Sequence, residues 1–217
     1  MAPTIFIVPG FYEAPRSSNL SPTASMDEAS KHPNMDDDIA NIAKDLAPVV
    51  EEAGDEGVVA VMHSAGGFIG SGALKRLNSQ ARQDSGKAGG VKKIIFITAG
   101  VAPEGYEQGP MEFFDYHSCK DPRNLLYGDF SDEEASEWLP GLQHQADRGW
   151  ATKVQYCGWR EVPSVYIICE GDRILPVELQ ESFAGLAGSE IMKVDAGHMV
   201  QLSQTEKVAG IIASHAN

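Results

Sequence analysis

Five short apolar runs recur along the chain, and most of them are continuous rather than alternating with polar residues. Strands buried on both faces of a parallel sheet have this pattern, and parallel neighbours need crossover connections, usually helices. The sequence therefore predicts an α/β fold, a mostly parallel sheet flanked by helices. The runs are TIFIV at 4–8, VVAVM at 58–62, VKKIIFIT at 91–98, PSVYIIC at 163–169 and EIMKVD at 190–195.

The segments between these runs carry apolar residues at helical spacing. Three aspartates at 36–38 predict the start of a helix, because acidic side chains stabilise its positive end. Ile39, Ile42 and Leu46 then repeat at intervals of three or four residues, which places them on one helix face. Further helices are predicted at 67–82, 177–187 and 204–215.

Residues 104–162 interrupt this alternation. They contain all three tryptophans, several other aromatic residues and no clear strand. We therefore predict a helical lid inserted into a core of residues 1–103 and 163–217, and an aromatic lid of this kind can wall an apolar pocket. The alternative is a second packing layer that binds no ligand. Residues 14–35 are polar and rich in Ser and Pro, which predicts a loop.

Composition and charge argue against several partners. The 217 residues suffice for one domain with an insertion. The formal net charge is −14, and Lys and Arg never form a run longer than a pair, which disfavours nucleic acid and anionic membranes. The N-terminal apolar run of about five residues is too short for a signal peptide or membrane span, so we expect a cytoplasmic protein. The three cysteines lack metal-ligand spacing, so neither a disulfide framework nor a metal site is indicated.

The stretch VVAVMHSAGG carries a candidate nucleophile. Ser64 follows a predicted buried strand and precedes a helix, and Gly66 and Gly67 let the backbone turn sharply. This is the setting of a nucleophile elbow, a tight strand-to-helix turn that projects a serine hydroxyl. Met62 stands where the usual pattern has its first glycine, so its side chain must find room beside the helix. A purely structural serine is the alternative.

A nucleophilic serine needs a base, and the base needs an acid that orients it. Apart from His63, His198 is the one histidine of the six that follows a predicted strand, although it could instead cap the last helix. His63 adjoins the serine, but neighbours around such a turn point apart, so we expect it to be packed. Asp172 lies just after the fourth apolar run and is the preferred acid, ahead of Asp195 and Glu170.

These candidates follow one another in the order serine, acid, histidine, and each comes after a predicted parallel strand. The carboxyl ends of parallel strands lie at one edge of a sheet, so we expect the three side chains to meet there. The oxyanion of an acyl-transfer intermediate needs backbone N–H donors. We expect these from Ala65 and Phe11, because Gly10 lets the loop after the first strand approach closely.

Several motifs together resemble one family. They are VPGF at the first strand, MDDDIANI before the elbow, VMHSAGG, the acid loop CEGDRILPVELQ and the segment AGHMVQLSQTEKVA. They resemble the α/β-hydrolases, in particular the branch of plant-type methyl-ester esterases, hydroxynitrile lyases and small fungal esterases. The resemblance implies an α/β-hydrolase fold, whose triad has the same chain order. Members of this superfamily share no single substrate.

Two positions bear on the type of reaction. Hydroxynitrile lyases of this branch carry a Lys directly after the catalytic His and a Thr in the oxyanion loop. This chain has Met199 and Gly10 at those positions, and both choices resemble the esterases. The resemblance therefore implies hydrolysis of a small-molecule ester or lactone.

The resemblance also assigns roles to individual residues. Ser64 attacks and forms an acyl-enzyme, His198 transfers the proton, and Asp172 orients His198. The substrate-binding residues that it implies are Gly10, Tyr12 and Met199. No metal and no organic cofactor is implied, because serine acyl transfer takes its nucleophile and proton relay from side chains.

The chain departs from the family near residues 14–35. The family has a helix and a further strand between the oxyanion loop and the helix before the elbow, and that strand pairs with the first strand. Here the region is short and holds no apolar run, so the strand at 4–8 is expected at an open sheet edge. We therefore predict a homodimer that pairs through this edge.

Two other functions fit the same residues. One is a hydrolase-like protein that binds a small apolar molecule with little or no turnover. Met62 and the missing strand favour it, whereas the three candidate catalytic residues oppose it. The other uses the same three residues to cleave a C–C bond, a reaction that the superfamily also performs.

Overall fold

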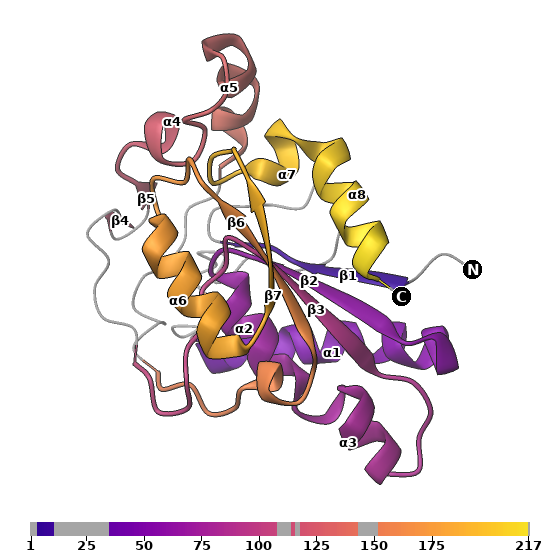
Figure 1. The fold of residues 1–217 in the computed structure, drawn as a ribbon. Coiled ribbons are helices and arrows are strands. Elements are labelled where there is room, and N and C mark those ends of the chain that lie inside the picture. The colour runs from indigo at the N-terminus through magenta and orange to yellow at the C-terminus, as the bar shows by residue number, and fades with distance from the viewer. Residues whose placement is uncertain (1–3, 11–34, 108–113, 116–117, 143–151, 217) are drawn as a thin grey trace.

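The computed structural model describes residues 4–10, 35–107, 114–115, 118–142 and 152–216 (Figure 1). Within them, five parallel strands form one sheet in the spatial order β1-β2-β3-β6-β7. Each predicted apolar run forms one strand, within one residue at either end, which confirms the predicted α/β class. The strands are β1 (Thr4–Val8), β2 (Val58–His63), β3 (Val91–Ile97), β6 (Ser164–Cys169) and β7 (Glu190–Val194).

Helices cover both faces of this sheet (Figure 1). They are α1 (Met35–Ala53), α2 (Gly66–Ala73), α6 (Val177–Ala187), α7 (Val200–Ser203) and α8 (Thr205–His215). On the face covered by α1, α2 and α6, Ala60 of β2 shares a buried cluster with Leu46 of α1. On the face covered by α7 and α8, Val59 and Val61 share a second cluster with Val208. Alternate residues of β2 thus enter opposite clusters, as in a strand buried on both faces.

The helix predicted at 67–82 is not continuous. α2 ends at Ala73, a 3-10 turn follows, and α3 (Ser79–Asp84) begins after Asn78. The Asn78 side chain accepts a hydrogen bond from the Ala81 N–H at 2.8 Å and donates one to the Leu74 carbonyl at 3.2 Å. Asparagine is a preferred residue at the N-cap of a helix, so Asn78 marks the start of α3 and the break from the preceding helix. Among the described residues, the 3-10 helices are η1 (Gly54–Glu56), η2 (Leu74–Arg76), η3 (Leu139–Gly141) and η5 (Gly158–Arg160).

The described part of segment 104–162 includes two short helices, α4 (Pro122–Leu125) and α5 (Asp132–Trp138). The expectation of no strand there is wrong, because β4 (Phe114–Asp115) and β5 (Ser118–Cys119) form a short antiparallel pair. Leu126 and Phe130 of this segment cluster with Ile174 and Met199 in the loops that follow β6 and β7. Val154 and Trp159, later in the segment, belong to the core cluster on one face of the sheet. The division into a core and a lid stays a prediction.

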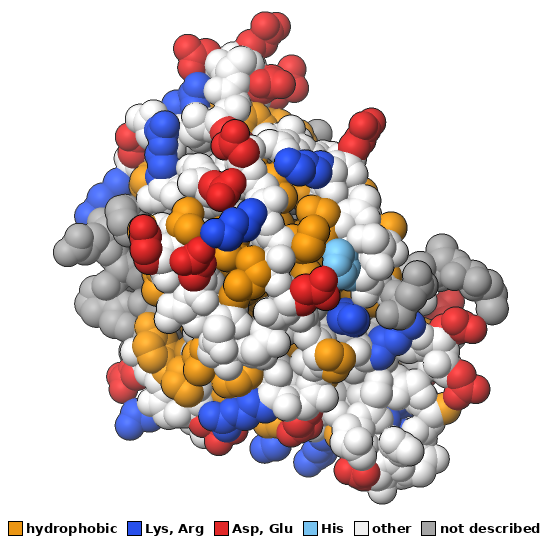
Figure 2. All heavy atoms as spheres, in the orientation of Figure 1, with side chains coloured by type: hydrophobic (Ala, Val, Ile, Leu, Met, Phe, Trp, Pro, Cys, Tyr) orange, Lys and Arg blue, Asp and Glu red, His pale blue; other side chains and the backbone are white. Residues whose placement is uncertain are grey.

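Acidic side chains dominate one extremity of the surface. Figure 2 shows them gathered over α5, whose sequence DEEASEW has four carboxylates in seven residues. This distribution agrees with the net charge of −14. In the part of the chain that the structure describes, no helix is both long and apolar enough to cross a membrane.

One edge of the sheet lacks the protection that the other edge has. Among the described residues, β1 pairs with β2 alone, and Ile5 and Ile7 are 43% and 58% exposed. The opposite edge strand, β7, carries Glu190 and Lys193, whereas β1 has no charged residue. Charged side chains on edge strands oppose pairing with another chain. The open edge of β1 agrees with the sequence prediction, although residues 14–34 of the predicted loop lie outside the described residues.

The predicted homodimer follows from this edge. Equivalent strands that meet at a two-fold axis run antiparallel, so pairing centred on Phe6 would set Ile5 of one copy against Ile7 of the other. We expect the wild-type protein to sediment as a dimer in analytical ultracentrifugation and the double variant Ile5→Lys/Ile7→Lys to sediment as a monomer. Ile191→Lys on β7, where Ile191 is 44% exposed, is the matched control. A wild-type monomer at high concentration would contradict the prediction.

Candidate active site

The turn between β2 and α2 holds Ser64 in a conformation that few residues adopt. Its φ angle is 51°, in the left-handed region, which costs a non-glycine residue on the order of 1–3 kcal/mol. The Ser64 N–H donates to the Ile97 carbonyl at 3.2 Å, and the Ser64 carbonyl accepts from Gly67 at 3.1 Å and Gly100 at 2.9 Å. These bonds hold the turn, which has the geometry expected of a nucleophile elbow.

Glycine at position 10 lets the loop after β1 approach the elbow. A Cβ atom at Gly10 would lie 2.6 Å from the Cβ of Ser64 and 3.2 Å from its Oγ. Any larger residue would therefore force this loop away from the serine. The predicted oxyanion loop thus lies next to Ser64 as far as Gly10. Phe11 and Tyr12, for which a donor role and substrate binding were predicted, lie outside the described residues.

Met62 finds its room beside the helix at a glycine. The side chain is fully buried, and a Cβ atom at Gly70 of α2 would lie 2.9 Å from its Sδ. The absence of a side chain at position 70 therefore accommodates the methionine that replaces the usual glycine. This replacement leaves the turn at Ser64 in place.

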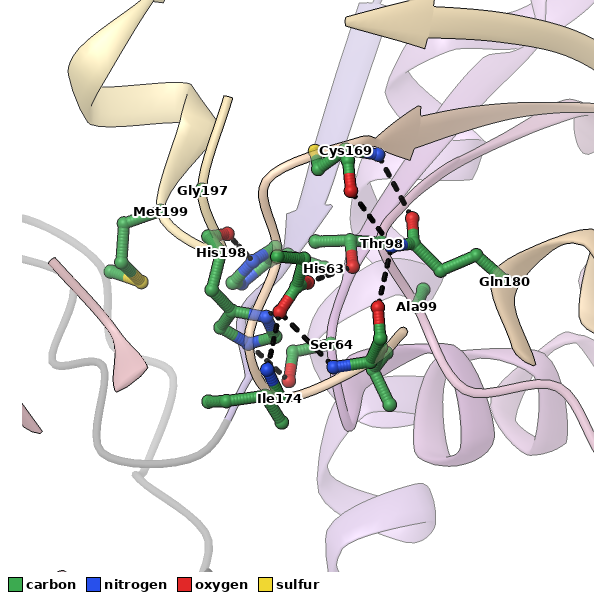
Figure 3. A network of polar contacts seen from close by, with 12 residues as sticks. His63, Ser64, Thr98, Ala99, Cys169, Ile174, Gln180, Gly197, His198 and Met199 are labelled. Carbon is green, nitrogen blue, oxygen red and sulfur yellow. Dashed lines mark hydrogen bonds and ion pairs between the residues drawn. The ribbon is translucent and has the colours of Figure 1, made fainter. Parts of the chain in front are cut away.

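Ser64, His198 and Asp172 meet in one hydrogen-bonded row (Figure 3). The distance from Ser64 Oγ to His198 Nε2 is 2.9 Å, and that from His198 Nδ1 to Asp172 Oδ2 is 2.7 Å. The side chains of His198 and Asp172 are 2% and 0% exposed. With Nδ1 protonated and donating to the carboxylate, Nε2 is free to accept the serine proton. The structure thus brings together all three residues that the sequence predicted.

Asp172 is surrounded by hydrogen-bond donors. Its Oδ2 accepts from the Thr98 hydroxyl as well as from His198, and its Oδ1 accepts from the N–H groups of Ile174 at 2.7 Å and Leu175 at 3.1 Å. Burial raises the pKa of Asp172, but the charge of His198 and these hydrogen bonds outweigh burial and hold the pKa below its usual value. The carboxylate therefore stays ionised.

The rival acids do not take part in this row. Asp195 and Glu170 are both exposed, whereas the side chain of Asp172 is fully buried. Thr98 was missed by sequence reasoning, although it ends the apolar run of β3 and so belongs to the same sheet edge. Its φ angle of 35° turns the backbone at that point.

Gln180 of α6 was also missed, and it secures the loop that carries Asp172. Its Oε1 accepts from the Cys169 N–H at 2.9 Å, while its Nε2 donates to the carbonyls of Cys169 at 2.9 Å and Leu175 at 2.6 Å. The residue is fully buried, and every hydrogen-bonding group of its amide is used. The only sign of this role in the sequence is a glutamine on a helix face that is otherwise apolar.

His63 is buried, as predicted, but its ring lies beside the base. Its Nε2 donates to the backbone carbonyl of His198 at 2.8 Å, and the two ring centroids are 4.8 Å apart. His63 therefore supports the loop of His198 from the side of β2.

The structure also places two further predicted site residues, Ala65 and Met199. Ala65 is the N-cap of α2, directly after the nucleophile, where backbone N–H groups favour negative charge. Met199 is 4% exposed and belongs to the apolar cluster of segment 104–162.

Comparison with known proteins agrees with this geometry. The model of the alpha/beta hydrolase family matches residues 8–211 of the chain. The chain therefore belongs to the α/β-hydrolase family.

Individual relatives are distant in sequence but similar in fold. Alpha/beta hydrolase nvfD from Aspergillus novofumigatus is 26% identical over 251 aligned positions, which cover 100% of this chain and 97% of the relative. A mutant of polyneuridine aldehyde esterase has a TM-score of 0.71 at 15% identity, with 99% of each chain covered. The methylesterase MES16 from Arabidopsis has a TM-score of 0.63 at 16% identity, covering 82% of this chain and 76% of that one. These structures confirm the predicted α/β-hydrolase fold.

The alignment with the Aspergillus relative is longer than this chain. It spans 251 positions, whereas this chain has 217 residues. The relative therefore contains residues that this chain lacks.

Proposed function

We propose that the protein is a serine hydrolase that cleaves a carboxylic ester or lactone of a small apolar molecule. The observation that carries this proposal is the row from Ser64 Oγ to His198 Nε2 at 2.9 Å and from His198 Nδ1 to Asp172 Oδ2 at 2.7 Å. Membership of the α/β-hydrolase family supports hydrolase activity, and the structural neighbours named above include esterases.

In the proposed reaction, Ser64 Oγ attacks the carbonyl carbon while its proton passes to His198 Nε2. The ionised Asp172 stabilises the resulting imidazolium through Nδ1. His198 then donates this proton to the oxygen of the leaving alcohol as the ester bond breaks. The acyl group stays on Ser64. Water attacks the acyl-enzyme with His198 as base, which releases the acid and restores the serine.

The negative oxygen of each tetrahedral intermediate needs donors placed in advance. The proposal assigns these to the N–H groups of Ala65 and Phe11, with Gly10 giving the substrate access. Met199 and Tyr12 are proposed to contact the rest of the substrate. Met199 in place of a lysine after His198 supports ester hydrolysis over cyanohydrin cleavage. A cytoplasmic location stays a prediction.

Labelling with a fluorophosphonate tests the nucleophile directly. We expect the wild-type protein to be labelled at Ser64, as located by peptide mass spectrometry, and Ser64→Ala to remain unlabelled. Ser214→Ala, which changes an exposed serine on α8, is the control and should label like the wild type. Labelling that survives Ser64→Ala would refute the assignment.

The same experiment separates the alternatives. A protein that only binds a small apolar molecule would not react with the fluorophosphonate. A C–C hydrolase would be labelled at Ser64 but would leave p-nitrophenyl esters and lactones intact. Labelling together with turnover of p-nitrophenyl acetate is the result that the proposal requires.

A further inference from the structure

Segment 104–162 contacts two loops of the candidate site. One follows β6 and carries Asp172, and the other follows β7 and carries His198. Its apolar residues pack around Ile174, two positions after Asp172, and around Met199, directly after His198. Arg173 lies against Gly128 of the same segment, where a Cβ atom would be 3.3 Å from the guanidinium carbon. A displacement of the segment would therefore reach both loops.

One polar side chain of this segment binds the histidine loop directly. Asp129 lies between α4 and α5, and its Oδ2 accepts hydrogen bonds from the Gly197 N–H at 2.8 Å and from the Ser203 hydroxyl at 2.7 Å. Gly197 is buried and immediately precedes His198. A hydrogen bond from a backbone N–H to a carboxylate is stronger than one between neutral groups.

Position 197 is shaped for this contact. A Cβ atom at Gly197 would collide with Oδ1 of Asp129, so only glycine lets the carboxylate lie against the backbone there. Two side chains outside segment 104–162 also bind the same loop. Gln204 donates to the Asp195 carbonyl at 2.6 Å, and His63 donates to the His198 carbonyl at 2.8 Å.

We propose that Asp129 is a positioning residue for His198, which it holds in line with Ser64 by fixing the Gly197 peptide from segment 104–162. The inference rests on the proposed hydrolase function. If the inference holds, the orientation of His198 depends on a segment outside the sheet. Gln204 and His63, which bind the same loop, lie outside that segment. Small displacements of a catalytic group cost large factors in rate, so loss of this contact should lower turnover.

The variants differ in which contacts they keep. Asp129→Ala removes both hydrogen bonds. Asp129→Asn keeps an oxygen that can accept from Gly197, and so tests the contact rather than the charge. Glu133→Gln, at an exposed position of α5, removes one negative charge from the same segment and serves as the control.

We expect Asp129→Ala to lower both kcat for a p-nitrophenyl ester and the rate of fluorophosphonate labelling by about 10- to 30-fold, with KM changed less than threefold. Asp129→Asn should recover most of the rate, and Glu133→Gln should match the wild type. In all three proteins the midpoint of thermal unfolding is measured, so that a loss of folded protein is recognised.

A double-mutant cycle tests the contact itself. Gly197→Ala should lower kcat in the wild-type background, because its Cβ displaces the carboxylate, but should cost much less in the Asp129→Ala background. Wild-type kcat in folded Asp129→Ala, or equal losses in the alanine and asparagine variants, would overturn the inference. If wild-type labelling survives Ser64→Ala, the proposed function fails instead, so the two failures are distinguishable.

Discussion

Replacement of His198 by alanine is expected to lower kcat for p-nitrophenyl acetate by roughly 10⁵- to 10⁶-fold, a loss typical of a serine triad without its base. The Ser64 hydroxyl lies 2.9 Å from His198 Nε2, and its proton would have no acceptor in the variant. A neutral hydroxyl is a weak nucleophile, so the acylation step should nearly stop. The measurement is steady-state hydrolysis with purified, folded protein. His215→Ala on α8 is the control, because His215 bonds to the Ile211 carbonyl and lies outside the row.

The two catalytic side chains should act as one unit. If His198 serves only to activate Ser64, the double variant Ser64→Ala/His198→Ala should be no slower than either single variant. Additive losses, or more than about one hundredth of wild-type kcat in His198→Ala, would contradict a base role.

The sequence sufficed for the parallel strands and for the residues at their carboxyl ends. Both follow from local patterns, since a strand buried on two faces is a continuous apolar run and a turn at its end exposes the next polar residue. Ser64, Asp172 and His198 each stand at such an end. One edge of a parallel sheet then gathers them although they lie far apart in the chain.

The residues that support the row could not be found in this way. Gln180 binds Cys169 and Leu175 from across a helix, and Asp129 binds Gly197 over 68 positions of the chain. Such contacts depend on how elements pack in space, which no local spacing encodes. The break after Ala73 was missed for a different reason. The predicted helix ran through Asn78, whose side chain instead caps the start of α3.

Asp172→Asn is expected to lower kcat roughly 10⁴-fold at neutral pH while leaving the fold intact. In the wild type, the N–H groups of Ile174 and Leu175 donate to Oδ1, and His198 and Thr98 donate to Oδ2. An amide has only one oxygen, and the two backbone donors would hold it at the Oδ1 position.

The amide nitrogen of the variant would therefore face His198 Nδ1 as a donor. The imidazole would then keep its proton on Nε2, which could no longer accept the proton of Ser64. Asp195→Asn is the matched control, because Asp195 is exposed and lies three residues before His198. Wild-type kcat in Asp172→Asn together with a loss in Asp195→Asn would reverse the assignment of the acid.

Acid unfolding gives an independent measure of the same carboxylate. The pKa of Asp172 is lowered in the folded state, so its stabilising contribution is complete above the unfolded pKa of about 3.9 and is lost as the pH falls through the folded value. The wild-type free energy of unfolding in urea should thus decline more steeply below about pH 4 than that of Asp172→Asn, which has no proton to bind there. Parallel declines would show that the pKa of Asp172 is not lowered in the folded state.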